Sequence, residues 1–344
     1  MTWYSNVVYP LLARGEAEWV HERTLAALAL AGKTAVFSPL LHAIAGKLPR
    51  RPVFLFGLTF PNVLGMAAGF DKDVRVAEGL ALLGFGHVEV GTLTPRPQGG
   101  NPRPRIFRLR EDGALINRMG FPNGGVAAAL PRLAALGQKQ RNFVLGVSLG
   151  KQKETPLAEA ERDYVAVMTA VYPYADYLAV NISSPNTPGL RELQGGRYLD
   201  HLLGVLQGEN GRLAAQHEGK KRPLLVKIAP DLTWDELDEI LAACQRNSVD
   251  GIIATNTTLS REGLTAANRE ETGGLSGVPL CQRSTDIIAA IARQTSLPII
   301  GVGGVRTAVD VQQKLDAGAS LVQLYTGLVY EGPALPGRIL RDLR

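Results

Sequence analysis

Two lysines occupy positions whose neighbours are apolar or small. Lys227 lies within the apolar run 224–229, and Lys72 ends the glycine-containing segment 67–72. A lysine is costly to bury without a partner, so Lys227 indicates a contact with a bound ligand. A lysine next to a glycine at the end of a strand reaches the anionic group of a ligand. Together the two lysines predict a site for an anionic molecule.

Amide and hydroxyl side chains gather in three segments. The longest, residues 181–191, reads NISSPNTPGLR and is typical of a polar loop that closes over a site. Residues 117–121 (NRMGF) and the pair Asn256-Thr257 add further polar groups. Amides present hydrogen-bond donors and acceptors together, which suits a planar ligand with carbonyl and N–H edges, such as a pyrimidine. A single asparagine is more often a turn or cap residue, but that explanation is weak for the whole set.

Glycine-rich segments near the end of the chain predict a phosphate site. Residues 300–304 read IGVGG, residues 318–320 read GAS, and an apolar run ends at residues 325–327, YTG. In (β/α)8 barrels, backbone N–H groups after the last two strands and a short helix N-terminus hold a phosphate. Glycine permits the close backbone approach that this requires. Tight turns are the alternative explanation, and the pattern specifies no more than a phosphorylated ligand.

The elements that would position these residues repeat along the chain. Eight short apolar runs, each ending in small or polar residues, are found at 63–68, 87–92, 143–149, 177–183, 224–229, 251–256, 299–304 and 321–327. Continuous apolar runs of this length are typical of parallel strands buried on both faces. Amphipathic stretches at 158–171, 234–245 and 284–292 follow several of them. The pattern predicts an α/β fold, a (β/α)8 TIM barrel whose chemistry lies at the strand C-termini.

Residues 1–50 lack a strand pattern and predict helices. Apolar residues recur at helical spacing over residues 3–12, and residues 16–30 and 39–47 indicate two further helices. No run approaches the roughly 18 apolar residues that span a bilayer, and no signal-peptide pattern is present. Such an N-terminal helical extension either caps the barrel as ordinary core or lies on a membrane as an amphipathic hairpin. Composition alone favours the cap.

Composition and charge narrow the function classes. The 344 residues are 45% hydrophobic and 20% charged, as in a folded globular protein. The net charge of +5 includes a cluster of five arginines between Arg96 and Arg110, which indicates a phosphate, a nucleic acid, an anionic membrane or simply a solvated loop. Two cysteines and five scattered histidines predict neither a disulfide framework nor a metal site. Basic stripes with interleaved aromatic residues are missing from the sequence, so no nucleic-acid partner is expected.

Taken in order, these motifs resemble the quinone-dependent (class 2) dihydroorotate dehydrogenases, which are flavin enzymes of pyrimidine synthesis. The resemblance covers the helical extension and residues 69–73, 91–98, 117–121, 181–187, 227–231, 254–258, 272–277 and 301–304. It implies two parts, a membrane-associated segment at residues 1–50 that forms a quinone tunnel and an FMN-binding catalytic barrel at residues 51–344. It also implies oxidation of dihydroorotate to orotate with a membrane quinone as the electron acceptor.

The resemblance assigns site residues one by one. The implied FMN contacts are Ala68, Gly69, Lys72, Thr92, Ser148, Asn181, Lys227, Thr255, Gly277, Gly304, Tyr325 and Thr326. The implied substrate contacts are Lys72, Asn117, Arg118, Met119, Gly120, Phe121, Asn181, Asn186, Asn256 and Thr257. Ser148 stands where many family members carry asparagine, and its shorter side chain has less reach. Pro122 likewise replaces a common asparagine.

Ser184 matches the catalytic base of the family and would take a proton from C5 of dihydroorotate while a hydride leaves C6 for flavin N5. Lys72 would contribute charge at the substrate carboxylate and the flavin edge. A serine is a weak base at its ordinary pKa, and no histidine or carboxylate adjoins it in the sequence, which leaves a water relay. Ser183 is expected to matter less.

His21 and Arg108 match positions associated with the quinone tunnel. The resemblance therefore reverses the preference for a cap and makes residues 1–50 a monotopic membrane contact. A monomer, held peripherally on the cytoplasmic side of the cell membrane, is the expectation.

Four other functions remain open from the sequence. The soluble class of the same enzyme usually has a cysteine as its base and lacks the extension, unlike this chain. A phosphosugar lyase or isomerase on the same barrel would leave the amides unexplained. A non-catalytic membrane-docked protein would bind lipid but no flavin, and a flavin enzyme acting on RNA would need a basic stripe.

Overall fold

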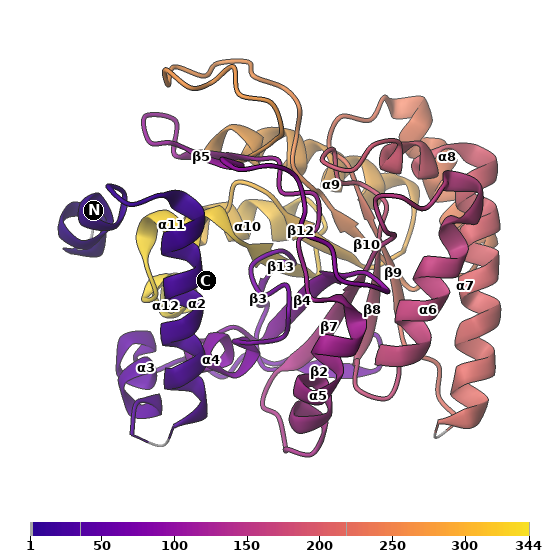
Figure 1. Ribbon diagram of the computed structural model, residues 1–344, viewed down its shortest axis with the longest axis horizontal. Helices are drawn as coiled ribbons and strands as arrows, with labels where there is room; N and C mark the ends of the chain where they lie inside the picture. The colour runs from indigo at the N-terminus through magenta and orange to yellow at the C-terminus, as the bar shows by residue number, and fades with distance from the viewer. Residues whose placement is uncertain (1–2, 35, 218, 344) are drawn as a thin grey trace.

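The eight apolar runs form a closed barrel of parallel strands in the computed structural model, which describes residues 3–34, 36–217 and 219–343. The order around the barrel is β10-β12-β13-β3-β4-β7-β8-β9 (Figure 1). The strands are β3 (Leu64–Met66), β4 (His87–Leu93), β7 (Val144–Leu149), β8 (Tyr177–Asn181), β9 (Leu224–Ile228), β10 (Gly251–Ala254), β12 (Ile299–Val302) and β13 (Leu321–Leu324). The predicted TIM barrel is confirmed, and every residue of these strands is buried.

Helices cover the outside of the barrel, which explains why its strands are apolar on both faces. They are α4 (Ala77–Leu82), α5 (Gly125–Gly137), α6 (Ala160–Val171), α7 (Gly196–Gln216), α8 (Trp234–Arg246), α9 (Cys281–Gln294), α10 (Ala308–Asp316), α11 (Thr326–Glu331) and α12 (Leu335–Asp342). Short 3-10 turns occupy Leu157–Glu159, Leu190–Gln194 and Val278–Leu280. Helix α8 begins at a capping box in which Thr233 and Glu236 satisfy each other's backbone N–H groups. The predicted helices at 158–171, 234–245 and 284–292 are confirmed.

A hairpin of β1 (Val53–Leu55) and β2 (Leu58–Phe60) closes the N-terminal end of the barrel. Phe60 is fully buried among the inward side chains of the strands. Its ring meets the His87 ring edge to face, with 5.5 Å between the ring centres. The sequence did not predict this hairpin.

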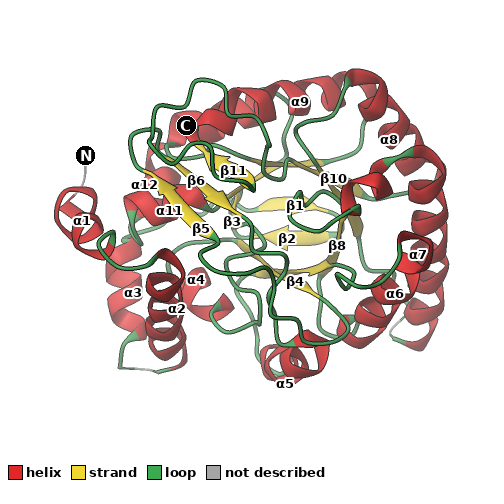
Figure 2. Cartoon of the chain, turned by 45° about the horizontal axis from the view of Figure 1, so that its top comes forward, coloured by secondary structure: helices red, strands yellow, loops and turns green. Residues whose placement is uncertain are grey.

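A second unpredicted element is a three-stranded antiparallel sheet at the other end of the barrel. It contains β5 (Ile106–Leu109), β6 (Ala114–Asn117) and β11 (Gly274–Gly277) in the order β11-β6-β5. Figure 2 shows these strands grouped together to one side of the barrel strands. The sheet brings residues from two distant loops to the same end of the barrel.

The N-terminal segment is helical, as predicted. A π-helical turn (Tyr4–Val8), α1 (Tyr9–Leu12), α2 (Ala17–Lys33) and α3 (Ser38–Ala45) lie against one flank of the barrel (Figure 1). Glu16 caps α2 by accepting hydrogen bonds from the N–H groups of Glu18 and Trp19. Helix α2 packs on α4 so closely that a Cβ on Gly32 would lie 2.7 Å from the Gly79 nitrogen.

The arginine cluster holds the N-terminal segment against the barrel. Arg105 and Glu18 form a buried ion pair, in which Arg105 Nη2 lies 2.6 Å from Glu18 Oε1. Arg103 also pairs with Glu18, and Arg108 donates to the carbonyl oxygen of Gly15 at 2.8 Å. The guanidinium of Arg110 lies over the ring of Tyr9. This docking role is not recognisable in the sequence, because the acidic partner is 85 or more residues away.

Among the described residues, no single helix has both the length and the apolar composition needed to cross a bilayer; α2 and α3 meet these criteria only as a pair bent by 106°.

Candidate active site

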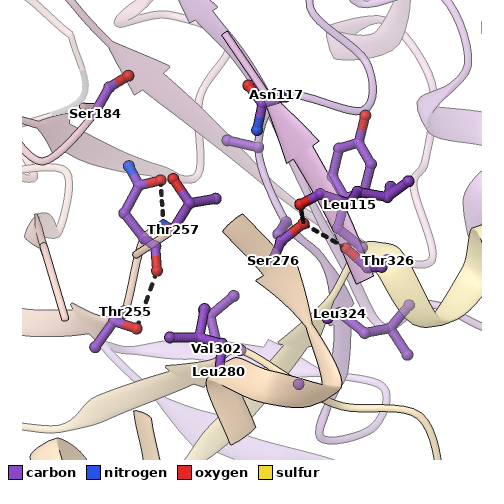
Figure 3. A pocket seen from close by; sticks show the side chains of 18 of the residues that line it. Leu115, Asn117, Ser184, Thr255, Thr257, Ser276, Leu280, Val302, Leu324 and Thr326 are labelled. Atoms are coloured by element: carbon purple, nitrogen blue, oxygen red, sulfur yellow. Dashed lines mark hydrogen bonds between the residues drawn. The ribbon is translucent and has the colours of Figure 1, made fainter. Parts of the chain in front are cut away.

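A cavity opens at the C-terminal end of the barrel strands, beside the antiparallel sheet. It encloses about 1290 Å³ of atom-free space, part of which is open to solvent. Ligand pockets for small molecules and cofactors commonly measure about 300–1,000 Å³, so the space accommodates a ligand larger than a single substrate. Figure 3 shows Ser184 on one side of this cavity, with Ser276 and Thr326 on the other.

Nearly all residues predicted to contact a flavin line this one cavity. They are Ala68, Gly69, Lys72, Thr92, Asn181, Lys227, Thr255, Gly277, Gly304, Tyr325 and Thr326. Ser148 is the exception, because its side chain lies behind the wall. Its Oγ is 2.9 Å from Oγ1 of Thr92, which in turn accepts a hydrogen bond from the Asn181 amide at 2.8 Å. Ser148 therefore reaches the cavity only through Thr92.

The residues predicted to hold the substrate also line the cavity, again with one exception. Those present are Lys72, Asn117, Met119, Gly120, Phe121, Asn181, Asn186, Asn256 and Thr257. Arg118 is directed elsewhere, since its Nη1 pairs with Glu271 at 2.6 Å and its guanidinium lies over the Phe107 ring. Its contribution to the cavity wall is limited to the backbone that carries Asn117 and Met119.

The amide side chains are linked to one another across the cavity wall. The Asn186 amide donates to Asn117 Oδ1 at 3.1 Å, and the Asn256 amide donates to Ser183 Oγ at 3.0 Å. The N–H of Thr257 donates to Asn256 Oδ1 at 2.8 Å, as drawn in Figure 3. Side chains from three separate segments of the chain are therefore held in fixed orientations around one space. Such preorganised donors and acceptors are what recognition of a planar polar ligand requires.

Lys227 has an anionic partner that the sequence analysis missed. Its Nζ lies 3.1 Å from Oε1 of Glu89, and both side chains are buried. The other carboxylate oxygen accepts hydrogen bonds from the hydroxyl of Tyr177 and the amide of Gln323, each at 3.1 Å. Burial and the Glu89 charge raise the pKa of Tyr177, which keeps its hydroxyl a donor. The available signal was a carboxylate in the otherwise apolar run HVEV.

Lys72 borders both this cavity and a smaller polar one beside α2. Its Nζ donates to the carbonyl oxygen of Gly69 at 2.5 Å. Burial lowers the pKa of Lys72 to about 8, partly opposed by the charges of Glu22 and Glu18. The lysine is therefore cationic at neutral pH, but close enough to neutrality for modest alkali to discharge it.

Ser184 lies in the loop after β8 and lines the cavity. Its Oγ accepts a hydrogen bond from the N–H of Asn186 at 3.3 Å, and no described carboxylate or imidazole hydrogen-bonds to it. Arg191 fixes the loop, because it donates to the carbonyl oxygens of Ser183 and Thr257 at 3.0 and 2.8 Å and pairs with Asp231 at 2.7 Å. The hydroxyl is therefore held at a defined place on the wall.

The far end of the cavity suits a phosphate. Gly304 has a positive φ of +73°, and a Cβ there would lie 2.4 Å from the Cα of Cys281. The N–H groups of Gly303 and Gly304 donate to no acceptor in the described chain. Thr326 begins α11, where the first N–H groups of a helix have no intrahelical partner. Its hydroxyl donates to Ser276 Oγ at 2.8 Å. Free N–H donors beside glycines are suited to an anion, so the predicted phosphate site remains a prediction that this geometry accommodates.

A second, apolar cavity lies between the N-terminal helices and the barrel. It encloses about 1580 Å³ of atom-free space, and it is lined by His21 and Arg108, the two residues predicted to lie at a quinone tunnel. His21 Nε2 has no hydrogen-bond partner among the described residues, and burial lowers the pKa of this imidazole to about 3. Its ring meets Phe70 edge to face. The histidine is therefore neutral throughout the ordinary pH range.

The two cavities share a wall. Ile106, Leu115 and Tyr325 line both of them. Two of these residues belong to β5 and β6 of the antiparallel sheet, which the sequence analysis did not predict. The same sheet contributes Ser276, and the loop after β12 contributes Arg306, which pairs with Glu331 at 2.8 Å. Only the GLSG motif at 274–277 offered a signal for this part of the site.

Known proteins resemble this chain along its whole length. Residues 52–344 match the family model described as dihydroorotate dehydrogenase. A dihydroorotate dehydrogenase (quinone) from Methylococcus capsulatus is 50% identical, over 98% of this chain and 98% of that protein. One from Chloroflexus aurantiacus is 52% identical, over 96% of this chain and 93% of that protein. The crystal structure of an Eimeria tenella DHODH in complex with ferulenol has a TM-score of 0.86 at 38% identity, covering 95% of this chain and 90% of that one.

Proposed function

The chain belongs to the dihydroorotate dehydrogenase family, in its quinone-dependent class, and from this premise we propose that FMN binds at the barrel mouth. The observation that carries the proposal is the convergence of the phosphate cradle, the Lys227–Glu89 pair and the linked amides on one cavity. When bound, FMN supplies the acceptor for the hydride that leaves C6 of dihydroorotate. The remaining tasks fall to side chains of this protein.

Different residues of the cavity hold the two ends of the flavin. Gly277, Gly304 and Thr326 hold the phosphate with backbone N–H and hydroxyl donors. At the other end Lys227 donates to the ring, while the carboxylate of Glu89 pairs with this buried lysine. The positive φ of Gly69, +95°, places backbone rather than a side chain along the wall.

The substrate is held by amides and by one cation. Asn117, Asn186 and Asn256 match the carbonyl and N–H edges of the dihydropyrimidine ring, and Lys72 faces its carboxylate. Ser184 removes the C5 proton and passes it to water. Arg191 anchors the loop that carries this hydroxyl on the cavity wall, which supports this role.

Electrons leave through the apolar cavity, which binds the quinone with His21 and Arg108 at its wall. The surface around its mouth supports a peripheral membrane contact, on the cytoplasmic side, through residues 1–50. The exposed large apolar side chains there are Trp3, Val7, Leu11, Leu12, Trp19, Leu30, Val36, Phe37 and Leu40. A patch of this kind is typical of a membrane or protein interaction site. The protein acts as a monomer, with both cavities complete in one chain.

The first test is the cofactor itself. The purified protein is expected to be yellow, and its visible absorbance is expected to bleach when dihydroorotate is added without oxygen. Added quinone then restores the colour. A colourless protein that takes up no FMN would refute the cofactor assignment, and a yellow protein that dihydroorotate does not bleach would refute the substrate.

Orotate binding is expected to weaken above about pH 8, because the free Lys72 loses its charge near this pH. The lowered pKa means that the cation is largely present at pH 7 and is lost as the pH rises through about 8. The dissociation constant, read from the flavin absorbance, should then increase by up to about tenfold per pH unit.

Two controls accompany that titration. Uracil, which lacks the carboxylate, should bind weakly and with no change between pH 7 and 9. The Lys72→Gln variant should bind orotate weakly and independently of pH. Equal pH profiles for this variant and the wild type would remove Lys72 from the carboxylate site.

A further inference from the structure

A buried lysine without an anionic partner lies behind the phosphate end of the cavity. Lys314, on α10, is completely buried, and in the described chain no carboxylate comes within ion-pair distance of it. Its Nζ donates to Ser284 Oγ at 3.0 Å and Thr285 Oγ1 at 3.2 Å. Burial lowers the pKa of Lys314 to about 8, partly opposed by Cys281 and by the more distant carboxylates of Asp310 and Asp286, so it remains mostly protonated at neutral pH. A buried cation of this kind requires an anion nearby to offset its loss of hydration.

The lysine is connected to the glycine cradle by one chain of hydrogen bonds. Ser284 accepts from Lys314 and donates its own proton to the carbonyl oxygen of Val302 at 2.5 Å. That carbonyl belongs to the peptide whose N–H is that of Gly303, and Gly303 lines the cavity. Hydrogen bonds in series polarise one another, so a cation at the start strengthens the N–H donor at the end.

Close packing brings the same groups together. A Cβ placed on Gly303 would lie 3.1 Å from Ser284 Oγ, and one placed on Gly301 would lie 3.3 Å from Lys314 Cδ. The lysine side chain therefore runs along the outer face of β12, one layer behind the strand end. Its charge acts across a buried layer, where charges interact more strongly than in water.

The cations that line this cavity have carboxylate partners close by or lie at its opposite end. Arg306 pairs with Glu331, which also pairs with Arg338, each at 2.8 Å. Lys227 pairs with Glu89. At its phosphate end the wall therefore offers backbone N–H and hydroxyl donors, together with the Arg306 guanidinium that shares Glu331 with Arg338. Behind this wall Lys314 adds a positive charge that no ion pair among the described residues offsets.

We propose that Lys314, acting through Ser284 and the Val302–Gly303 peptide, is the positioning residue that selects phosphorylated FMN over riboflavin. The proposal rests on FMN being the cofactor. Lys314 touches neither flavin nor substrate; it strengthens the N–H donors of the cradle and supplies the charge that compensates the phosphate.

The test compares two ligands that differ only in the phosphate. FMN and riboflavin are titrated separately into the full-length protein stripped of flavin, and binding is read from quenching of flavin fluorescence. Lys314→Met keeps the length of the side chain and removes its charge. We expect the affinity for FMN to fall by about tenfold or more, while that for riboflavin stays within about twofold. Ser284→Ala interrupts the chain of hydrogen bonds but keeps the lysine. It should lower the ratio of FMN affinity to riboflavin affinity as well, by a smaller factor.

Lys151→Met is the matched control. Lys151 is also buried and donates to the carbonyl oxygens of Gln152 and Thr155, but it is not part of the cavity wall. Its loss should leave the ratio of FMN to riboflavin affinity at the wild-type value. An unchanged ratio in Lys314→Met, or equal losses for both flavins, would overturn the proposal, and if that variant does not fold, the ratio in Ser284→Ala decides. A wild-type protein that binds neither flavin would instead refute FMN as the cofactor and this role with it.

Discussion

Replacing Ser184 with alanine slows the reduction of bound flavin by dihydroorotate by about 10²–10⁴-fold, the range that a positioned general base contributes. The hydroxyl is the protic side chain that the loop after β8 holds on the cavity wall, and alanine removes the proton acceptor without altering the loop anchors. Arg191 would still bind Ser183, Thr257 and Asp231. Orotate affinity is therefore expected to stay near the wild-type value. Anaerobic stopped-flow absorbance measures the reduction step alone.

Ser183→Ala is the matched comparison for that experiment. Ser183 is equally buried, but its Oγ accepts a hydrogen bond from the Asn256 amide and does not line the cavity. Loss of Ser183 should lower the rate of flavin reduction less than loss of Ser184 does. Its main effect should be on substrate affinity. Wild-type reduction rates in Ser184→Ala would exclude the serine as the base.

Filling the apolar cavity with an indole separates the two half-reactions. Ala27 lies on the face of α2 that lines this cavity, and Ala27→Trp is expected to lower quinone turnover by at least about 100-fold, since even one added methylene in an apolar pocket costs 10–200-fold. Flavin reduction by dihydroorotate should stay unchanged, because the barrel mouth is untouched. Steady-state quinone assays and anaerobic bleaching measure the two steps independently.

Ala26→Trp is the control, because Ala26 is exposed on the same helix but does not line the cavity. Neighbouring helix positions point about 100° apart, so the same indole then lies outside. Undiminished quinone turnover in Ala27→Trp would contradict the assignment of this cavity. Truncation of residues 1–50 is a poorer test, because Leu25, Leu28 and Leu41 belong to the main core and Glu18 neutralises the buried Arg105.

The sequence was sufficient for the barrel because each parallel strand is recognisable on its own. A strand buried on both faces appears as a continuous apolar run, and helical spacing in residues 3–47 likewise identified the N-terminal helices. The antiparallel sheet was not predicted, because its strands are four residues long and β6 pairs with β11 from a distant part of the chain. Pairing over such a separation leaves no periodic signal in either segment.

The site, like the fold, was predictable only where a residue is unusual among its neighbours in the sequence. Glycines at strand ends and a lysine within an apolar run are local anomalies, so the cradle and Lys227 were found. Glu89 and Lys314 act through partners that only the fold brings near, and both were missed. The side-chain direction of Arg118, away from the cavity, is likewise set by a tertiary contact, its ion pair with Glu271.

The wall formed by Ile106, Leu115 and Tyr325 has a consequence for how two reactants of opposite solubility use one enzyme. If FMN binds against that wall as proposed, the water-soluble acid would arrive from the aqueous rim and the lipid-soluble oxidant from the bilayer. The two reactants therefore do not compete for one binding site. The shared wall lets electrons pass from the water-soluble acid to the lipid-soluble quinone, while each reactant stays in the solvent in which it dissolves.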